Sequence, residues 1–377
     1  MEAVFSTTAA PVKFDGEGKL KIMHVTDTHL DDDNIDMSLF LIEQSCIREK
    51  PHIVIITGDN VQNYDDCEKT KKYIHRLMSI FDAQGIKCAV TFGNHDSEVG
   101  AMTRKELLDC YNSYDCCVGV DTGDTFEYCG TYNIPVLSKD GSQVKFNLWV
   151  FDSGDYDKEG HYGCVEEKAV QWYREKSADL ARENGGKVYS LAFQHIIVPE
   201  VYDYLKKTNK RKLYSFSHMY NKNEYYMFDP KQTNYETLNE TPCCGYPNYG
   251  QFEAMVETGD VLGIFTGHDH TNAFGVKGKG IDIVNSLSTR YNGDRFSSMY
   301  GYRMLFVDES TPDTYTTSVS RWYDMFKVSD IKKFKNDGNA IGAKTVKCLV
   351  TYGFVQKCLT KIGRTFTRVV TGRKVTY

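Results

Sequence analysis

Apolar and β-branched runs alternate along the first part of the chain with stretches whose apolar residues have helical spacing. The runs Ile22–Thr26, Ile53–Thr57 and Cys88–Phe92 predict strands, because each is short, continuous and bounded by polar residues. The stretches Ser38–Glu49 and Cys67–Gln84 between them predict amphipathic helices. Strands that alternate with helices form βαβ units, so we expect a mostly parallel sheet and an α/β fold.

The pattern changes after residue 120, where a second set of strand-like runs begins. A long helical stretch, Glu166–Glu183, interrupts this set, and a shorter one, Ala101–Tyr111, precedes it. The predicted strands are Thr125–Ile134, Gln143–Phe151, Lys187–Phe193, Val261–Thr266 and Gly280–Val284.

Polar residues capable of binding metal follow five of these strands directly. In chain order they are Asp27-Thr28-His29, Gly58-Asp59-Asn60, Gly93-Asn94-His95-Asp96, His195 and Gly267-His268-Asp269-His270. The carboxyl ends of parallel strands meet at one edge of a sheet, so we expect these side chains to converge. Carboxylate, amide and imidazole groups suit Mn, Fe, Zn or Mg, and the set has room for two ions. We interpret the remaining histidines as core or loop residues; they are His24, His52, His75, His161 and His218.

This series of motifs resembles the calcineurin-like metallophosphoesterase superfamily, whose pattern is D-x-H, G-D, G-N-H-D/E, H and G-H-x-H. The segments Phe151–Tyr156, Gln171–Tyr173 and Phe193–Glu200 resemble more narrowly the D-x-H branch of purple-acid-phosphatase-like proteins. The resemblance implies a four-layer α/β/β/α sandwich with a dinuclear centre at the carboxyl ends of the strands.

The same resemblance implies a role for each motif residue. Asp59 would bridge two ions, and a hydroxide between the ions would attack phosphorus. His95 would protonate the leaving oxygen, with Asp96 orienting its ring; alternatively, Asp96 caps the helix that follows. The other implied ligands are Asp27, His29 and His270 for the first ion and Asn94, His195 and His268 for the second.

True purple acid phosphatases carry D-x-G and a tyrosine that binds ferric iron. In this chain His29 replaces that glycine, and Gln62 stands where the spacing would place the tyrosine. Tyr64 lies two residues too far along. The resemblance therefore does not extend to a ferric tyrosinate centre.

Composition is typical of a globular enzyme, with 41% hydrophobic and 25% charged residues in 377. The net charge of −6 disfavours a nucleic-acid partner. The resemblance implies a phosphorylated small molecule or a phosphoprotein as substrate. No run of 18 apolar residues occurs, and Met1–Lys13 lacks the features of a signal peptide, so we expect a cytoplasmic protein. The twelve cysteines form no C-x-x-C pair and are interpreted as small buried apolar residues.

Three parts are expected: a tail at residues 1–12, a phosphoesterase domain at 13–325 and a basic C-terminal extension at 326–377. Residues 200–250 hold nine tyrosines and a lysine-rich cluster, which either shape the substrate site or pack as a surface loop. Residues 331–377 hold 11 Lys or Arg and one acidic residue, Asp337. By helical spacing Val355, Leu359, Ile362, Phe366 and Val370 share one face. That face either docks on the domain or contacts an anionic membrane or an acidic partner.

Arg290 follows the last predicted strand and is expected either to contact a phosphate oxygen or to form a structural ion pair. For the whole chain, two classes of function are open. One is a metal-dependent phosphoesterase, in which a phosphomonoesterase is favoured over a phosphodiesterase. The other is a binding or scaffold protein that has the fold without turnover.

Overall fold

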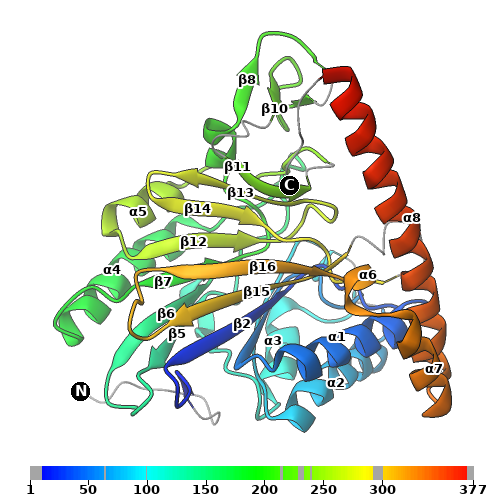
Figure 1. Cartoon of the computed structure of the whole chain (residues 1–377). Helices are drawn as coiled ribbons and strands as arrows, with labels where there is room; N and C mark the ends of the chain where they lie inside the picture. The colour runs from blue at the N-terminus through cyan, green and yellow to red at the C-terminus, as the bar shows by residue number, and fades with distance from the viewer. Residues whose placement is uncertain are drawn as a thin grey trace.

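The computed structural model describes residues 11–62, 65–98, 100–212, 215–227, 233–237, 240–291 and 300–371. Side chains are not described for residue 124, for β11 (Thr233–Thr237), or for residues 352, 356, 357 and 359–371 of α8 (Ala340–Thr371). The described part of the chain contains two large sheets and one small sheet, together with the helices that pack on them (Figure 1).

The first large sheet has five strands in the order β16-β15-β2-β3-β4. Its strands β2 (Lys19–Val25), β3 (Ile53–Thr57) and β4 (Lys87–Thr91) are parallel, as the alternating pattern predicts. The strands β15 (Gly301–Asp308) and β16 (Tyr315–Arg321) add on antiparallel and make the sheet mixed.

Helices α1 (Ile35–Glu49) and α2 (Cys67–Gln84) pack on the outer face of this sheet in one apolar core. The predicted helix Cys67–Gln84 is confirmed at both bounds by α2. The bounds could be predicted because both ends carry clear local signals. The Asp66 carboxylate accepts hydrogen bonds from two backbone amides of the first turn, and Gly85 ends the helix at a φ of 64°.

The second large sheet has eight strands in the order β1-β5-β6-β7-β12-β14-β13-β11. At its centre β6 (Val144–Val150), β7 (Ser190–Phe193), β12 (Val261–Thr266) and β14 (Ile281–Asn285) are parallel. The flanking strands are β1 (Val12–Lys13), β5 (Tyr132–Leu137) and β13 (Ala273–Gly278).

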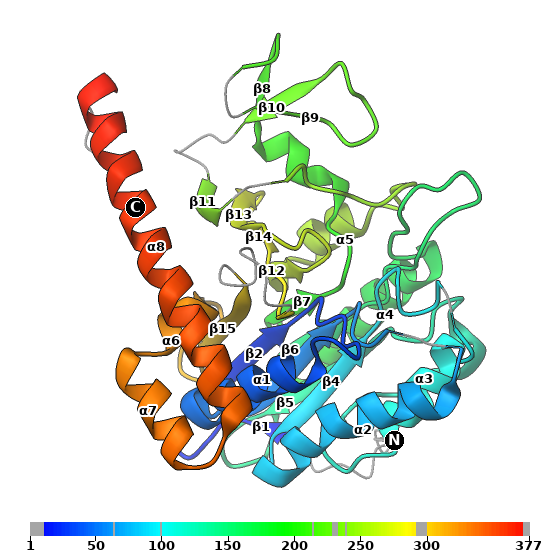
Figure 2. The ribbon, with the colours of Figure 1, turned by 90° about the vertical axis from the view of Figure 1, so that its right-hand side faces the viewer.

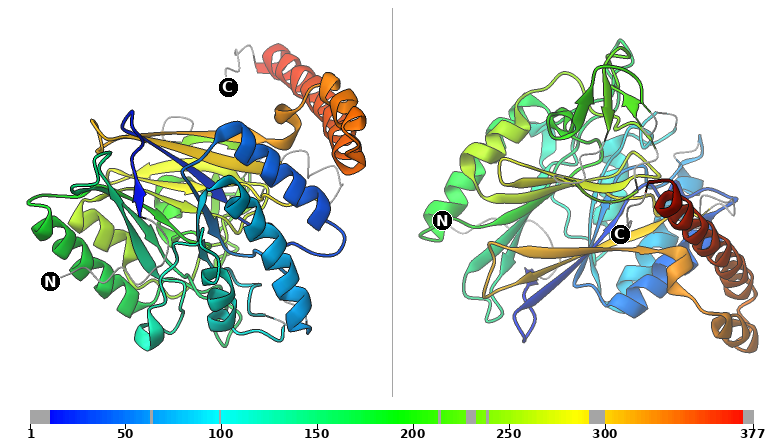
Figure 3. Two further views of the ribbon diagram at one scale, coloured as in Figure 1. Left: turned by 90° about the horizontal axis from the view of Figure 1, so that it is seen from below. Right: turned by 45° about the horizontal axis from the view of Figure 1, so that its top comes forward.

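Helices α4 (Glu167–Glu183) and α5 (Gln251–Thr258) cover the outer face of the eight-stranded sheet. A separate apolar core joins the inner faces of the two large sheets, with Ile22 and Leu305 packed among residues such as Phe193. Helices, sheet, sheet and helices thus follow one another through the molecule (Figure 3). The α/β fold class is confirmed.

The predicted strand Thr125–Ile134 is wrong over most of its length. A short 3-10 helix, Gly123–Thr125, comes first, and β5 begins only at Tyr132. The chain turns at Gly130, where a Cβ atom would lie 2.7 Å from Thr91 Oγ1. The aromatic and β-branched residues of this stretch favour a strand, but the close approach at Gly130 fixes a turn there instead.

The tyrosine-rich stretch holds a 3-10 helix (Pro199–Tyr204), β8 (Lys206–Thr208), β9 (Phe216–Ser217) and β10 (Tyr225–Met227). These three strands form the small sheet, which stands at the top of Figure 2. The tyrosines of residues 200–250 differ in burial. Tyr202 and Tyr226 belong to the apolar core that also contains Tyr173 of α4, whereas Tyr246 and Tyr249 are exposed. Tyr214 lies outside the described residues.

The C-terminal helices are α6 (Trp322–Met325), α7 (Val328–Asn336) and α8. The first part of α8 docks on α1: Val346 and Leu349 are buried, and a Cβ atom at Gly342 would lie 2.8 Å from Phe40. Farther along, Phe354 is 70% exposed. The rest of α8 stands clear of the sheets in Figures 1 and 2. No helix among the described residues is long and apolar enough to cross a membrane.

The membrane alternative for α8 can now be tested without removing its docked part. Residues 354–377 hold six Lys or Arg and no acidic residue. Each contributes about 1 kcal/mol near an anionic lipid surface. We expect the full chain to float with anionic liposomes and a 1–353 truncation to stay in solution with an unchanged melting temperature. Equal flotation of the two proteins, or none for either, would exclude this contact; neutral liposomes are the control.

Candidate metal centre

Every motif expected to bind metal lies at one edge, where strands of both large sheets end. Asp27 and His29 follow β2, Asp59 follows β3, and Asn94 follows β4. The other loops come from the eight-stranded sheet, with His195 after β7 and His268 and His270 after β12. The arrows of β2 and β12 point to the right in Figure 1, so Figure 2 faces this edge.

One group of four side chains surrounds a single point. Asp27, His29, Asp59 and His270 each place one possible ligand atom within 4.8 Å of the others. His270 Nε2 lies 3.3 Å from Asp27 Oδ1, and His29 Nε2 lies 3.5 Å from Asp59 Oδ2. The two imidazole Nε2 atoms are 3.1 Å apart. Two carboxylates and two imidazoles are a donor set for a borderline or hard divalent ion.

A second group shares Asp59 with the first. Asp59, His195 and His268 again lie within 4.8 Å, and His195 Nε2 is 3.3 Å from Asp59 Oδ2. Asn94, in the loop after β4, donates from its amide nitrogen to the Tyr156 hydroxyl at 2.7 Å, which leaves its Oδ1 as the remaining acceptor. Asp59 is the member common to both groups, which is the position of a bridging ligand.

Four buried polar atoms of the motif residues make no hydrogen bond of normal geometry, although imidazole nitrogens and carboxylate oxygens face one another at 3.3 Å. They are Asp27 Oδ1, Asp59 Oδ2, Asn94 Oδ1 and His195 Nε2. Buried polar atoms are nearly always paired, and leaving one unpaired costs about 1–3 kcal/mol. Four such atoms at one place indicate a partner other than protein. Cations in both groups would satisfy all four, so the donor set fits two metal ions.

The four imidazoles have two kinds of electrostatic environment, because the pKa is lowered at His29 and His268 and raised at His195 and His270. Burial lowers the pKa of His29 to about 4 and that of His268 to about 3, so both imidazoles are neutral at pH 7, as metal ligands must be. For His195 burial acts in the same direction, but the carboxylates of Asp59 and Asp27 outweigh it and raise the pKa to about 10. The buried carboxylates therefore favour positive charge at this point.

The backbone at the site adopts conformations that most residues avoid. Positive φ angles occur at Asp27 (53°), His29 (40°), Asp59 (50°) and His268 (72°), four of the six such non-glycine residues in the described part of the chain. Each costs of the order of 1–3 kcal/mol and persists where the surroundings enforce it, commonly at functional sites.

Close packing of the loops enforces this backbone, and it requires the glycines of the motifs. A Cβ atom at Gly267 would lie 1.9 Å from Thr26 Oγ1, and one at Gly93 would lie 2.3 Å from Asp59 Oδ1. The loop after β12 is tied to the loop after β2, because the His268 amide donates to Asp27 Oδ2 at 3.0 Å.

His95 lies beside the metal ligands without belonging to either group. Its backbone amide donates to Asp59 Oδ1 at 2.9 Å, and its ring centroid is 5.5 Å from that of His29. The side chain is 45% exposed, so its ring is open to solvent beside the two ligand groups.

Asp96 does not orient the ring of His95, which corrects both expectations for this residue. Its carboxylate accepts hydrogen bonds from the backbone amides of Asp59, Asn60 and Gly93, at 2.7, 3.0 and 2.8 Å. Glu98 pairs with His95 Nδ1 instead. Nor does Asp96 cap the next helix, because α3 (Arg104–Asn112) begins with a capping box at Thr103. Asp96 thus holds two ligand loops together.

Two further groups at the site were not predicted from the sequence. Arg104 is buried and donates to Asp152 Oδ1 at 2.7 Å and to the Gly93 carbonyl at 2.8 Å, so it fixes the loop that carries Asn94. The ring of Tyr162 packs edge-on against His268 at 4.3 Å. The resemblance of Phe151–Tyr156 to other proteins was a signal for Asp152, whereas nothing local marked Arg104 or Tyr162.

Of the two roles considered for Arg290, a phosphate contact and a structural ion pair, the structure favours the ion pair. Its Nη2 atom donates to Asp31 Oδ2 at 2.9 Å, and the side chain is 28% exposed. The guanidinium is therefore bound to the loop after β2. Tyr64, considered for a ferric centre, lies outside the described residues.

Comparison with known proteins agrees with this geometry. The calcineurin-like phosphoesterase family model matches residues 20–272, about two thirds of the chain, and the chain belongs to that family. A protein of Arabidopsis thaliana named probable inactive purple acid phosphatase 14 is 24% identical over 320 residues, covering 75% of this chain and 73% of its own.

Two more proteins are similar over different lengths. The yeast phosphatase DCR2 of Saccharomyces cerevisiae is 27% identical over 219 residues, which cover 51% of this chain and 37% of its own. Among solved structures, a dimetal phosphatase from Danio rerio superimposes with a TM-score of 0.48 at 12% identity. It covers 80% of this chain and 98% of its own.

Proposed function

We propose that this chain hydrolyses phosphate monoesters at a centre of two metal ions. The observation that carries the proposal is the pair of ligand groups that share Asp59, together with four buried atoms at the site that make no hydrogen bond of normal geometry. The first ion would be held by Asp27, His29 and His270, and the second by Asn94, His195 and His268. Two such ions activate water as a nucleophile and stabilise both the attacking and the leaving oxygen.

The remaining residues would orient the substrate and move its proton. His95, whose ring is open to solvent beside the two ligand groups, would donate a proton from Nε2 to the leaving oxygen. Glu98, at Nδ1, would keep that nitrogen protonated and the ring in position. Asp96 and Arg104 would act through the backbone by holding the ligand loops. The substrate would be a phosphorylated small molecule or a phosphoprotein.

A catalytically silent binding protein is the second candidate. Three plant relatives carry the name probable inactive purple acid phosphatase, at 24–25% identity, which favours this alternative. Against it, all seven proposed ligands and His95 are present in this chain. The yeast relative, by contrast, is named a phosphatase.

Hydrolysis of p-nitrophenyl phosphate decides between the two candidates. We expect turnover when the protein is loaded with Mn(II) and its loss after chelation, with recovery when metal returns. Bis-p-nitrophenyl phosphate measures diesterase activity in parallel, and we expect a lower kcat/KM for it. A protein that binds two equivalents of metal and turns over neither compound would be a binding protein. Zn, Fe and Mg are compared in the same assay.

A further inference from the structure

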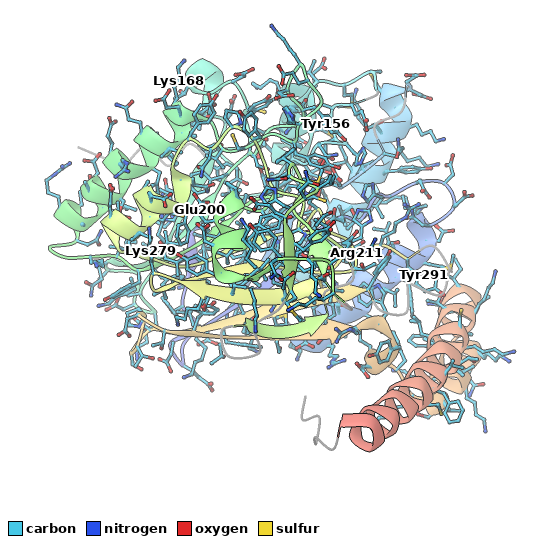
Figure 4. All side chains as sticks on the ribbon, turned by 90° about the horizontal axis from the view of Figure 1, so that it is seen from above. Tyr156, Lys168, Glu200, Arg211, Lys279 and Tyr291 are labelled. Carbon is cyan, nitrogen blue, oxygen red and sulfur yellow. The ribbon has the colours of Figure 1, made fainter. Side chains whose placement is uncertain are left out.

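Two tyrosines stand against the ligands proposed for the second ion. The ring centroid of Tyr162 lies 4.3 Å from that of His268, and the hydroxyl of Tyr156 accepts the hydrogen bond of Asn94. The two tyrosine rings are 5.5 Å apart. Both are partly exposed, and Tyr156 is labelled in Figure 4, on the side of the molecule away from α8. An aromatic surface therefore begins directly beside this ion.

A second set of rings adjoins Tyr162, whose backbone amide donates to the Tyr220 hydroxyl at 3.3 Å. His161 packs against Tyr220 at 5.1 Å and against Tyr246 at 5.0 Å, and Tyr246 is 52% exposed. We call Tyr156, His161, Tyr162, Tyr220 and Tyr246 the aromatic wall. None of the five is a proposed metal ligand.

The wall rests on two loops that are packed backbone to backbone. A Cβ atom at Gly245 would lie 2.1 Å from the carbonyl oxygen of Gly163, so only glycine permits this approach. The Tyr246 amide donates to the Tyr162 carbonyl at 2.8 Å, and the Tyr220 hydroxyl donates to the Cys244 carbonyl at 2.8 Å. These contacts hold the rings in place before any ligand binds, which lowers the entropic cost of binding.

We propose that the aromatic wall binds the leaving group of the substrate and that this group is an aromatic ring joined to the ester oxygen, as in an aryl phosphate. The inference rests on the proposed function. Tyr162 packs on the imidazole of one proposed ligand and Tyr156 binds the amide of another, so a ring packed on these two tyrosines would lie beside an ester held by the ions. Stacked or edge-on aromatic pairs contribute about 0.5–1.5 kcal/mol each.

The test compares phenyl phosphate with cyclohexyl phosphate, which have rings of similar size. We expect Tyr162→Leu and Tyr246→Leu each to lower the ratio of kcat/KM for phenyl over cyclohexyl ester about two- to tenfold. Tyr162→Phe keeps the ring and should keep the ratio. Tyr249→Leu is the matched control: this tyrosine belongs to the same loop and is 45% exposed, but it lies by Phe126 and Glu166, and its loss should leave both rates unchanged.

Metal content is measured for each variant, because Tyr162 touches a ligand. A ratio that stays constant in Tyr162→Leu and Tyr246→Leu with two ions bound would overturn the inference while leaving the phosphoesterase intact. If the metal-loaded wild type hydrolyses neither ester, the proposed function fails instead. Binding of phenylphosphonate and cyclohexylphosphonate to that protein then decides: tighter binding of the phenyl compound, lost in Tyr162→Leu, supports the wall, and equal binding overturns it.

Discussion

The substitution Asp59→Asn is expected to remove both metal ions and abolish hydrolysis. Asp59 is the only residue shared by the two ligand groups in the described part of the chain, and its Oδ2 atom is buried and makes no hydrogen bond of normal geometry. Taking one partner out of a buried charge pair costs about 3–5 kcal/mol, which corresponds to roughly 10²–10⁴-fold in the affinity for each ion. Metal analysis after dialysis, together with p-nitrophenyl phosphate turnover, measures the effect.

Asp260→Asn provides a matched control. Asp260 is also a buried carboxylate, but it lies just before the start of β12 and accepts from Ser190 Oγ at 2.9 Å and Trp149 Nε1 at 3.2 Å. Its loss should lower the melting temperature and leave two equivalents of metal. Two full equivalents and normal turnover in Asp59→Asn would show that Asp59 is not a bridging ligand.

His95→Ala is expected to lower kcat about 10²–10⁴-fold while both ions stay bound, because general acid catalysis contributes that much. The side chain lies outside both ligand groups, so its removal takes away a proton donor and no ligand. The loss should be smaller for p-nitrophenyl phosphate, whose leaving group needs little protonation, and larger for an alkyl phosphate. Single-turnover rates on both substrates measure the difference.

Glu98→Gln separates proton donation from other roles of His95. Glu98 is 44% exposed and keeps its hydrogen-bonding capacity as glutamine, so we expect a smaller loss in the same direction on the two substrates. Loss of an ion in His95→Ala would make His95 a ligand. Equal losses on both substrates would mean that His95 positions the phosphate and does not protonate the leaving group.

The sequence was sufficient for the elements whose signals are local. The run Ile53–Thr57 is a strand because all five residues are apolar or β-branched, and the structure has that strand at the same bounds. The sequence was also sufficient to predict that the motif residues lie close together, because the strand ends of βαβ units share one edge of the sheet. The strand expected at Thr125–Ile134 failed because Gly130 must approach Thr91, a contact between distant segments.

The parts of the site that escaped prediction depend on how loops pack. Glu98 follows His95 by three residues, yet only the turn between them brings the two side chains together. Arg104 opens α3 and looks like a helix residue in the sequence, but it points back to Gly93 and Asp152. The assignment of Asp96 failed for a related reason: its acceptors are used by amides of a loop more than thirty residues away.

The ligands come from both large sheets, and this has a consequence for how the protein keeps its shape. Each proposed ion would have donors in loops after β2, β3 or β4 and donors in loops after β7 or β12, so ions bound there would cross-link the two large sheets at this edge of the sandwich. By mass action, a ligand that binds only the assembled form stabilises it by RT ln(1 + [L]/Kd). Metal supply and conformational stability would thus be thermodynamically linked in this chain. A cell short of metal would hold a protein both less active and easier to unfold.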